Sequence, residues 1–225
     1  MILLGSVVNG GAVVVGGLVG MFVGKLLPER LRTSVMAALS LMTIGIAVPG
    51  LLKSNNALIP IISMVVGTLI GELLDIDSTV NKLGEKLQKR FSGSRVTEGF
   101  VTGSLVFAVG ALAVMGPLES GLQHQHSLLF SKSVIDGVAS IVFASTMGLG
   151  VALSGITVFV VEGSIALLAS VVVPYLGEAV VNEITFVGSL LIVGISLNLL
   201  GVTKLRILNM VPAIFLPILL CRFMG

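Results

Sequence analysis

Long apolar segments occupy most of this chain, and they limit its fold more than any other feature does. A transmembrane helix needs about 20 predominantly apolar residues, and we expect about eight spans (seven to eight) among the 225 residues. Only 11% of the residues are charged, against about 25% in a water-soluble domain, so polar groups could not cover the surface in water. The expected spans are Leu3–Leu26, Leu31–Leu52, Ala57–Leu74, Gly99–Met115, Val134–Gly155, Thr157–Tyr175, Ile184–Val202 and Ile207–Phe223.

Helices are the expected form of these spans, because in lipid every backbone polar group must find a partner within its own segment. The alternating pattern of a membrane barrel is not present. The sequence therefore predicts an all-α polytopic transmembrane helix bundle, with residues 1–225 forming a single integral membrane domain. A broken or re-entrant helix stays open at two places, since the fifth and sixth segments abut at Ser154-Gly155 and the short eighth contains Pro212 and Pro217.

Lys and Arg residues, which collect on the cytoplasmic side of membrane proteins, are spread unevenly over the connections. The connections after the first, third, fifth and seventh spans together hold ten of the 13. The opposite side holds Lys53, Lys132 and Arg222. This bias predicts that both termini lie on the extracytoplasmic side.

The connection after the third span has the pattern of an amphipathic helix over about residues 78–91. Val80, Leu83, Leu87 and Phe91 recur at helical spacing, and Lys, Arg and Glu occupy the other face. On the cytoplasmic leaflet its cations would contact anionic lipid headgroups. An ordinary solvated linker helix is the alternative.

An internal repeat relates several of the spans. The first, fourth and seventh spans open alike, with Gly5-Ser6-Val7-Val8, Gly103-Ser104-Leu105-Val106 and Gly188-Ser189-Leu190-Leu191. Residues 40–51 of the second span also match residues 145–156 of the fifth.

A repeated unit of three helices reverses its direction through the membrane with each copy. We therefore expect an inverted 3+3 helix repeat, with repeat A at about residues 1–76 and repeat B at about 97–176. The two C-terminal helices, at about 183–225, would begin a third copy. Inverted repeats are associated with secondary transporters, which bind substrate and ions near the midplane between the halves.

Glycine stripes mark the faces on which helices approach closely, as small residues do in membranes. Gly16, Gly20 and Gly24 form one stripe, Gly67 and Gly71 a second, and Gly99 and Gly103 a third. These faces would pack within one chain or form a homodimer. We expect a homodimer through glycine-rich faces as the oligomeric state.

Ionisable residues inside spans are costly and are therefore candidates for function. Glu162 lies about five residues inside the sixth span, where a carboxylate needs a proton, a cation or several donors. Asp136 follows Lys132 by one helical turn. A local ion pair between the two, without a functional role, is the alternative. Glu72 is close to the cytoplasmic boundary and could instead be an interfacial cap.

Neutral polar residues in the spans complete the expected polar path. They are Asn9, which shares a stripe with Gly16, together with Asn198, Asn209, Ser145 and Thr146. Each of them could simply bond a neighbouring helix. No basic residue is expected deep in a span, which favours a small cation, a proton or a neutral solute over an anion.

Enzymatic and cofactor-binding functions have little support in the sequence. The HExxH, GxSxG and phosphate-binding loop patterns are absent, and we expect no enzyme, no cofactor and no metal site. His124 and His126 could supply two metal ligands, but no third ligand group adjoins them. The net charge of +2 and the lack of a basic, aromatic-rich patch also argue against nucleic acid as a partner.

Several segments together carry a resemblance to a known family over essentially the whole chain. They are Gly5-Ser6-Val7-Val8-Asn9, Leu27-Pro28-Glu29-Arg30, residues 98–107, residues 132–137, residues 143–151 and Asn209-Met210-Val211-Pro212-Ala213. In these segments the chain resembles the uncharacterised bacterial inner-membrane proteins typified by YqgA and YdfK. The resemblance implies a multi-pass protein of the bacterial cytoplasmic membrane. The family has a domain-of-unknown-function label, so it implies no substrate and no site.

The repeat and the buried polar residues favour a small secondary transporter or channel for a small cation or neutral solute. The alternative is a non-transporting membrane scaffold or lipid-interacting protein, which would use the 78–91 helix and the glycine faces.

Overall fold

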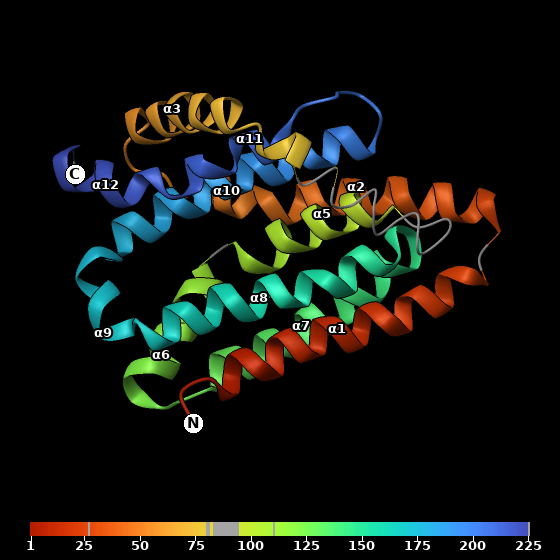
Figure 1. Ribbon diagram of the computed structural model, residues 1–225, viewed down its shortest axis with the longest axis horizontal. Coiled ribbons are helices and arrows are strands. Elements are labelled where there is room, and N and C mark those ends of the chain that lie inside the picture. Colours follow the sequence, from red (N-terminus) through yellow and green to blue (C-terminus); the bar gives the residue numbers. More distant parts are fainter. Residues whose placement is uncertain (27, 80–81, 83–94, 110, 225) are drawn as a thin grey trace.

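The computed structural model describes residues 1–26, 28–79, 82, 95–109 and 111–224, and these residues form helices and no strands. The expected helical membrane fold is therefore confirmed (Figure 1). The longer helices are α1 (Leu4–Lys25), α2 (Glu29–Leu51), α3 (Leu58–Leu74), α5 (Val96–Ala108), α6 (Ala111–Gln123), α7 (Ser127–Met147), α8 (Leu149–Leu167), α10 (Glu178–Leu199) and α12 (Leu216–Met224). Short helical segments are α9 (Ala169–Val172), η1 (Val173–Tyr175), α11 (Ile207–Met210) and η2 (Val211–Ile214).

The helices of the chain form two groups (Figure 1). In one group, α1 packs against α7 and α8, and α5 and α6 also pack against α8. In the other, α2 packs against α10, while α3 packs against α11, η2 and α12. Helices from the two predicted repeats therefore interleave, since α1 joins α7 and α8 whereas α2 and α3 join the C-terminal helices.

Within the described residues, five helices are long and apolar enough to cross a membrane: α1, α2, α7, α8 and α10. The pairs α5–α6 and α11/η2–α12 are bent by 59° and 43°, and counting each as one span gives up to seven. The apolar helix α3, with 17 residues, is shorter. The broken eighth span that Pro212 and Pro217 left open is present as a bend, while the count of eight spans stays a prediction.

The boundary between the fifth and sixth spans differs from the predicted one. The prediction placed it at Ser154-Gly155, but α7 ends at Met147 and α8 begins at Leu149. Gly148 between them has φ 70°, a conformation that glycine adopts without steric cost. Helix α7 also begins earlier than predicted, at Ser127 rather than Val134. Lys132, which we expected in a loop, therefore lies inside α7.

Glycines hold α1 against α7 and α8 at backbone contact. A Cβ atom at Gly20 would overlap the carbonyl of Ile141, and one at Gly17 would lie 2.6 Å from Cα of Ala152. The stripe on α3 is covered in the same way, because Gly67 faces Ala213. These glycine faces are therefore occupied within one chain and are not the free dimer surfaces that we expected; a homodimer would need another surface.

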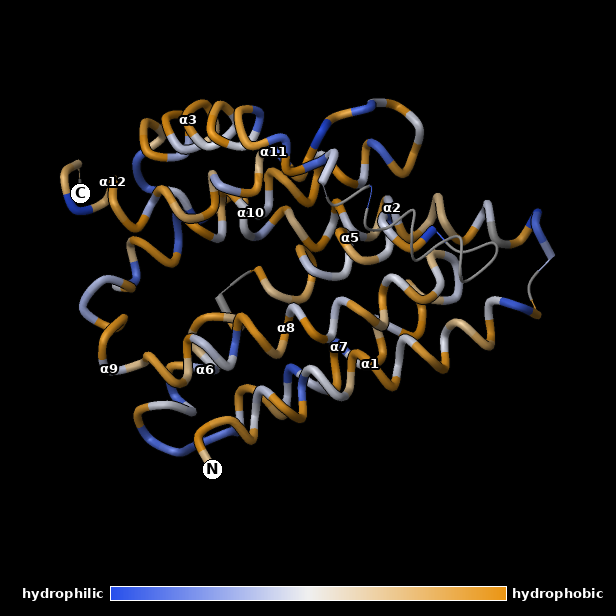
Figure 2. The backbone as a smooth tube through the Cα atoms, in the orientation of Figure 1, coloured by the Kyte–Doolittle hydropathy of each residue, from blue (hydrophilic) through white to orange (hydrophobic). Residues whose placement is uncertain are grey.

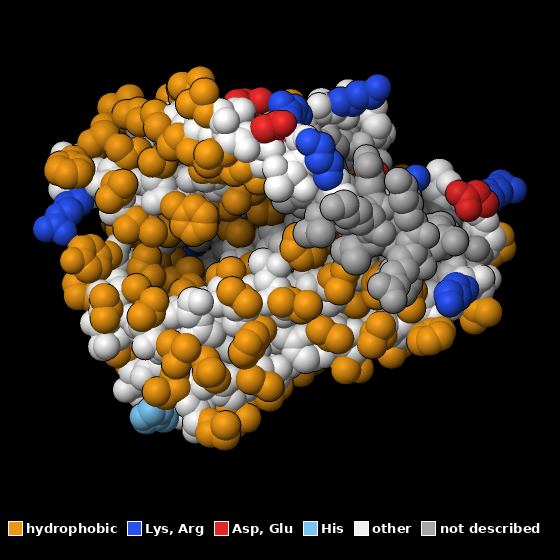
Figure 3. All heavy atoms as spheres, in the orientation of Figure 1, with side chains coloured by type: hydrophobic (Ala, Val, Ile, Leu, Met, Phe, Trp, Pro, Cys, Tyr) orange, Lys and Arg blue, Asp and Glu red, His pale blue; other side chains and the backbone are white. Residues whose placement is uncertain are grey.

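Hydrophilic residues collect at the two ends of the helices, and hydrophobic residues run along them (Figure 2). Exposed apolar side chains such as Val15, Phe22, Val134 and Val138 cover the outside, as lipid-facing helices require. The N- and C-termini lie toward the same end of the assembly (Figure 1). On the face in Figure 3, most of the visible Lys and Arg side chains lie toward the other end.

The inverted repeat stays a prediction. The amphipathic helix predicted over residues 78–91 falls almost entirely outside the described residues, as does its proposed contact with lipid headgroups.

Candidate functional site

Four polar side chains from three helices meet inside the first helix group. They are Asn9 on α1, Lys132 and Asp136 on α7, and Glu162 on α8. Asn9 and Glu162 are fully buried, and Lys132 and Asp136 are each 6% exposed. We call these four residues the polar cluster.

The backbone contacts of the three helices position this cluster. Gly10 on α1 lies against the backbone of Gly155 on α8, and Gly16 lies against Gly137 on α7. Without side chains at these positions, the helices come close enough for short polar side chains to reach across. Asp136 lies nine residues after the start of α7, about 14 Å along its axis, well inside the apolar length.

Asn9 and Lys132 connect the two carboxylates. The Asn9 side-chain amide donates to Glu162 Oε1 at 2.8 Å and to Asp136 Oδ2 at 3.1 Å. Lys132 Nζ forms a short ion pair with Asp136 Oδ2 and lies 3.4 Å from Glu162 Oε1. Asn9 therefore holds the two acidic side chains together from one side and Lys132 from the other.

The polar cluster has more negative than positive groups, and two of its acceptor atoms have no donor. With all groups ionised it has one positive and two negative charges. Glu162 Oε2 and Asn9 Oδ1 are buried and accept no hydrogen bond among the described atoms. Unpaired buried acceptors are rare and costly, so the cluster lacks one positive charge or hydrogen-bond donor.

A broken helix adjoins the polar cluster. Helix α5 ends at Ala108, and the next residue, Val109, has extended backbone angles (φ −114°, ψ 137°). The carbonyl oxygen of Phe107, in the last turn of α5, accepts a hydrogen bond of 2.6 Å from Lys132 Nζ. Carbonyls freed at helix breaks recur at ion and substrate sites of secondary transporters.

Lys132 is the functional candidate that sequence reasoning missed. The sequence predicted an extracytoplasmic loop position for Lys132 and no basic residue deep in a span; both predictions are wrong, because Lys132 is a buried residue of α7. The signal available was the spacing of Lys132 and Asp136 by four residues, one helical turn. That spacing predicted a local pair but could not show that Glu162 lies beside it.

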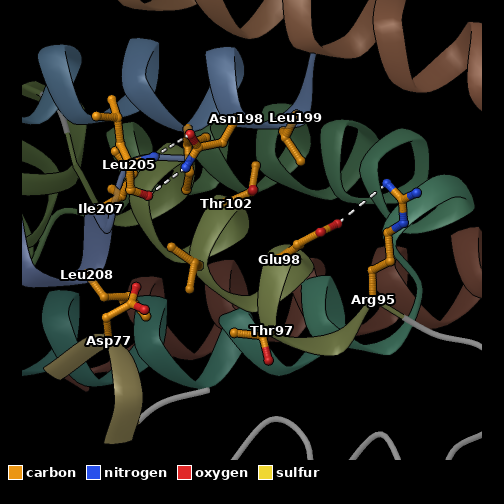
Figure 4. Close-up of a pocket in the computed structure, with 12 residues that line it drawn as sticks. Asp77, Arg95, Thr97, Glu98, Thr102, Asn198, Leu199, Leu205, Ile207 and Leu208 are labelled. Carbon is orange, nitrogen blue, oxygen red and sulfur yellow. Dashed lines mark hydrogen bonds and ion pairs between the residues drawn. The ribbon is translucent and has the colours of Figure 1, made fainter. Parts of the chain in front are cut away.

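Asn198 lies apart from the polar cluster and organises the connection between α10 and α11. Its Nδ2 donates to the Leu205 carbonyl at 2.7 Å, and its Oδ1 accepts from the Leu205 amide at 2.8 Å (Figure 4). It also lines a pocket of about 410 Å³ with the charged side chains of Asp77, Arg95 and Glu98. Arg95 and Glu98 form an ion pair at 3.5 Å.

Asn209 also lies outside the polar cluster. It is fully buried where α3 crosses α11, and its Oδ1 accepts a 2.7 Å hydrogen bond from the Asp77 amide. Its Nδ2 atom has no partner among the described atoms. Its Oδ1 therefore ties the short segment after α3 to the C-terminal helices.

Glu72 belongs to a surface ion-pair group near the loop between α10 and α11. It pairs with Arg206 at 2.7 Å, and Arg206 also contacts Asp75 and Asp77. The hydrogen bond to Asp75 and the charges of the three acidic groups raise the pKa of Arg206. Glu72 is 43% exposed, which fits the interfacial alternative better than a place in a transport path.

Ser145 and Thr146 bond their own helix rather than the polar cluster. Ser145 Oγ donates to the Val142 carbonyl and Thr146 Oγ1 to the Phe143 carbonyl. Thr146 also lines a second pocket of about 400 Å³. Of the eight predicted site residues, the structure brings together Asn9, Asp136 and Glu162, and it adds Lys132.

Glu183 is a third buried acid, and its hydrogen bonds are those of a loop cap. Its Oε1 accepts from Ser54 Oγ at 3.1 Å and from the amides of Asn55 and Asn56 at 3.0 and 3.4 Å. In the described part of the chain, no three His, Cys, Asp or Glu side chains are grouped as metal ligands would be. His126 instead shares a 2.8 Å hydrogen bond with Ser120.

The fold and the polar cluster define a multi-pass helical membrane protein with a charged group enclosed between its helices. A family described as "Protein of unknown function (DUF554)" matches residues 4–222. The chain belongs to this family, so the resemblance is confirmed.

Two relatives match nearly end to end. The "Uncharacterized membrane protein YdfK" of Bacillus subtilis (strain 168) is 30% identical over 219 residues, which cover 96% of this chain and 94% of YdfK. The "Uncharacterized protein YqgA" of Escherichia coli (strain K12) is 26% identical over 220 residues, covering 95% and 94%. No solved structure matches the chain.

Proposed function

We propose that this protein is a small secondary transporter or channel, without enzymatic activity, for a small cation or neutral solute. The observation that carries the proposal is the polar cluster of Asn9, Lys132, Asp136 and Glu162. Charged side chains enclosed between membrane helices cost several kcal/mol by insertion scales and mark ion or substrate pathways by default. Helix packing alone does not need them, because close glycine contacts already join α1, α7 and α8.

The broken α5–α6 pair supports the same function. Discontinuous helices in secondary transporters expose backbone carbonyls next to coupling ions, and the Phe107 carbonyl bonds a member of the polar cluster. The four side chains are closed off from solvent, with exposures of 6% or less. Such a closed arrangement corresponds to the occluded step of an alternating-access cycle.

The positive charges support an orientation in the bacterial cytoplasmic membrane with both termini on the extracytoplasmic side. Lys132 is inside α7, so of the Lys and Arg residues that the structure describes, Lys53 and Arg222 remain at the end that holds the termini. In this orientation the polar cluster lies in the extracytoplasmic half of the bilayer. Asn9 is five residues from the start of α1, about 8 Å along its axis.

Flux into proteoliposomes tests the proposal. The purified protein would be reconstituted and assayed with H⁺, Na⁺ and K⁺ gradients, and with glycerol and urea by light scattering. We expect flux of at least one probe above that of protein-free liposomes, and we expect Glu162→Gln to abolish it. Glu183→Gln is the matched control: it makes the same chemical change at another buried acid and keeps an oxygen that accepts the three loop hydrogen bonds.

A protein that carries none of these probes would contradict the proposal. That outcome would favour the alternative of a non-transporting scaffold or lipid-interacting protein. Equal flux through the wild type and Glu162→Gln would remove the polar cluster from the path.

A further inference from the structure

The two unpaired atoms of the polar cluster belong to the same pair of residues. Glu162 and Asn9 already share one hydrogen bond, from Asn9 Nδ2 to Glu162 Oε1 at 2.8 Å. The atoms without partners are the remaining ones of each group, Glu162 Oε2 and Asn9 Oδ1. Both side chains are fully buried, so solvent does not satisfy them.

Both unpaired atoms are acceptors as long as Glu162 is ionised. A carboxylate only accepts hydrogen bonds, whereas a protonated carboxyl group has one donor as well. A carboxylic acid and a primary amide can pair through two hydrogen bonds at once, one in each direction. A proton on Glu162 Oε2 would make this oxygen a donor, and Asn9 Oδ1 could accept its hydrogen bond. Neither atom would then be without a partner.

The same proton corrects the charge of the polar cluster. Lys132 and Asp136 form a close ion pair, which leaves the charge of Glu162 uncompensated. These two residues are the charged groups that face Glu162 in the described structure, both from α7, while α1 contributes the neutral Asn9. Protonation of Glu162 gives a neutral site, which low-dielectric surroundings favour strongly.

A metal cation fits the site less well than a proton does. Hard cations are bound by several oxygen ligands at once, and the described cluster has two unpaired oxygens. The ammonium group of Lys132 also lies 3.4 Å from Glu162 Oε1 and would repel a second cation.

We propose that Glu162 is a proton-binding site, in which a protonated Oε2 donates to Asn9 Oδ1. Release moves this proton from Oε2 to water on one side of the membrane and leaves a carboxylate beside Lys132; uptake reverses the step. The role of the proton as the coupling ion rests on the proposed function, but its binding to Glu162 does not.

Infrared spectroscopy of the protein in lipid nanodiscs tests the site without any transport. A protonated carboxyl group has a carbonyl band that is separate from carboxylate bands and shifts in D₂O. At neutral pH we expect this band in the wild type and in Glu183→Gln, and its loss in Glu162→Gln. Asn9→Leu should shift the band to higher frequency, because the hydrogen bond to Oδ1 is removed.

Folding of Glu162→Gln is itself informative, since Gln resembles a protonated Glu and can form both hydrogen bonds with Asn9. We expect it to match the wild type in thermal unfolding. A misfolded Glu162→Gln, a wild type without the band, or a band lost in Asp136→Asn but kept in Glu162→Gln would each overturn the proposal. A band with the expected pattern but no flux of any probe would retain the proton site and reject only the transporter.

Discussion

Lys132 determines the charge balance of the buried site. Its ammonium group reaches both carboxylates of the cluster and the Phe107 carbonyl. Asp136 and Glu162 could not change partners easily, because they lie on α7 and α8, which pack against α1 at backbone contact. The Lys132 side chain therefore connects Asp136, Glu162 and the broken end of α5.

Removal of this cation should destabilise the fold strongly. We expect Lys132→Met to lower the free energy of unfolding by about 3–5 kcal/mol, because breaking a buried pair leaves an uncompensated charge. The double variant Lys132→Met/Asp136→Asn should recover most of the loss. Chemical unfolding in detergent measures both, and a single variant as stable as the wild type would show that the pair is not buried in the membrane protein.

The sequence predicted three of the four cluster residues, and for a physical reason. Asn9, Asp136 and Glu162 are conspicuous because polar groups in apolar spans are costly. Lys132 could not be placed, because a cation near the end of an apolar segment looks the same whether it faces water or a buried acid. Asn198 and Asn209 were polar for another reason, since they bond loop and turn backbone.

Helix α1 packs against α7 at backbone contact, along a face formed by glycine. Its Gly16, Gly20 and Gly24 face backbone atoms of Gly137, Ile141 and Ser145 on α7. The spacing of four residues predicted this close face, but not which helix it contacts.

A matched pair of substitutions in α1 tests this contact. Gly20→Ala should lower the thermal stability, because its methyl group would overlap the Ile141 carbonyl and overpacking costs about 1–3 kcal/mol. Gly11→Ala is the control, since nothing lies within 4 Å of its added Cβ and alanine favours a helix by about 0.5–1 kcal/mol. Equal melting temperatures of the two variants in detergent would contradict the tight α1–α7 contact.

The ends of the spans were less predictable than their existence. Apolar segments continue on both sides of Gly148 and of Gly155, so hydropathy does not choose between the two glycines. The positive φ of Gly148 follows from the tertiary fold. The break of α5 at Val109 has a similar origin, because its sequence reads as one continuous apolar span.

Over the whole molecule, the helices of the two predicted repeats are mixed in space. Helix α1 lies with α7 and α8, whereas α2 lies with α10. The helical membrane fold was predictable because lipid permits few alternatives. The grouping was not, since the apolar faces of the spans are similar and the glycine stripes do not specify which helix they contact.

Thiol labelling tests the orientation of the whole molecule. In a Cys221→Ser background, Gly177→Cys and Lys204→Cys place single cysteines in connections at opposite ends of α10. We expect a membrane-impermeant reagent to label Gly177→Cys in intact spheroplasts and Lys204→Cys only after permeabilisation. The reverse pattern would place the termini in the cytoplasm.

The single-residue connection at Gly148 has a mechanical consequence. Helices α7 and α8 carry the ionisable side chains of the polar cluster, one residue connects them, and glycines hold both at backbone contact with α1. Together with α1 they form a stiff wall. If the polar cluster opens to water, as the proposed function requires, we expect the α5–α6 pair to move, because its 59° bend lies next to Lys132.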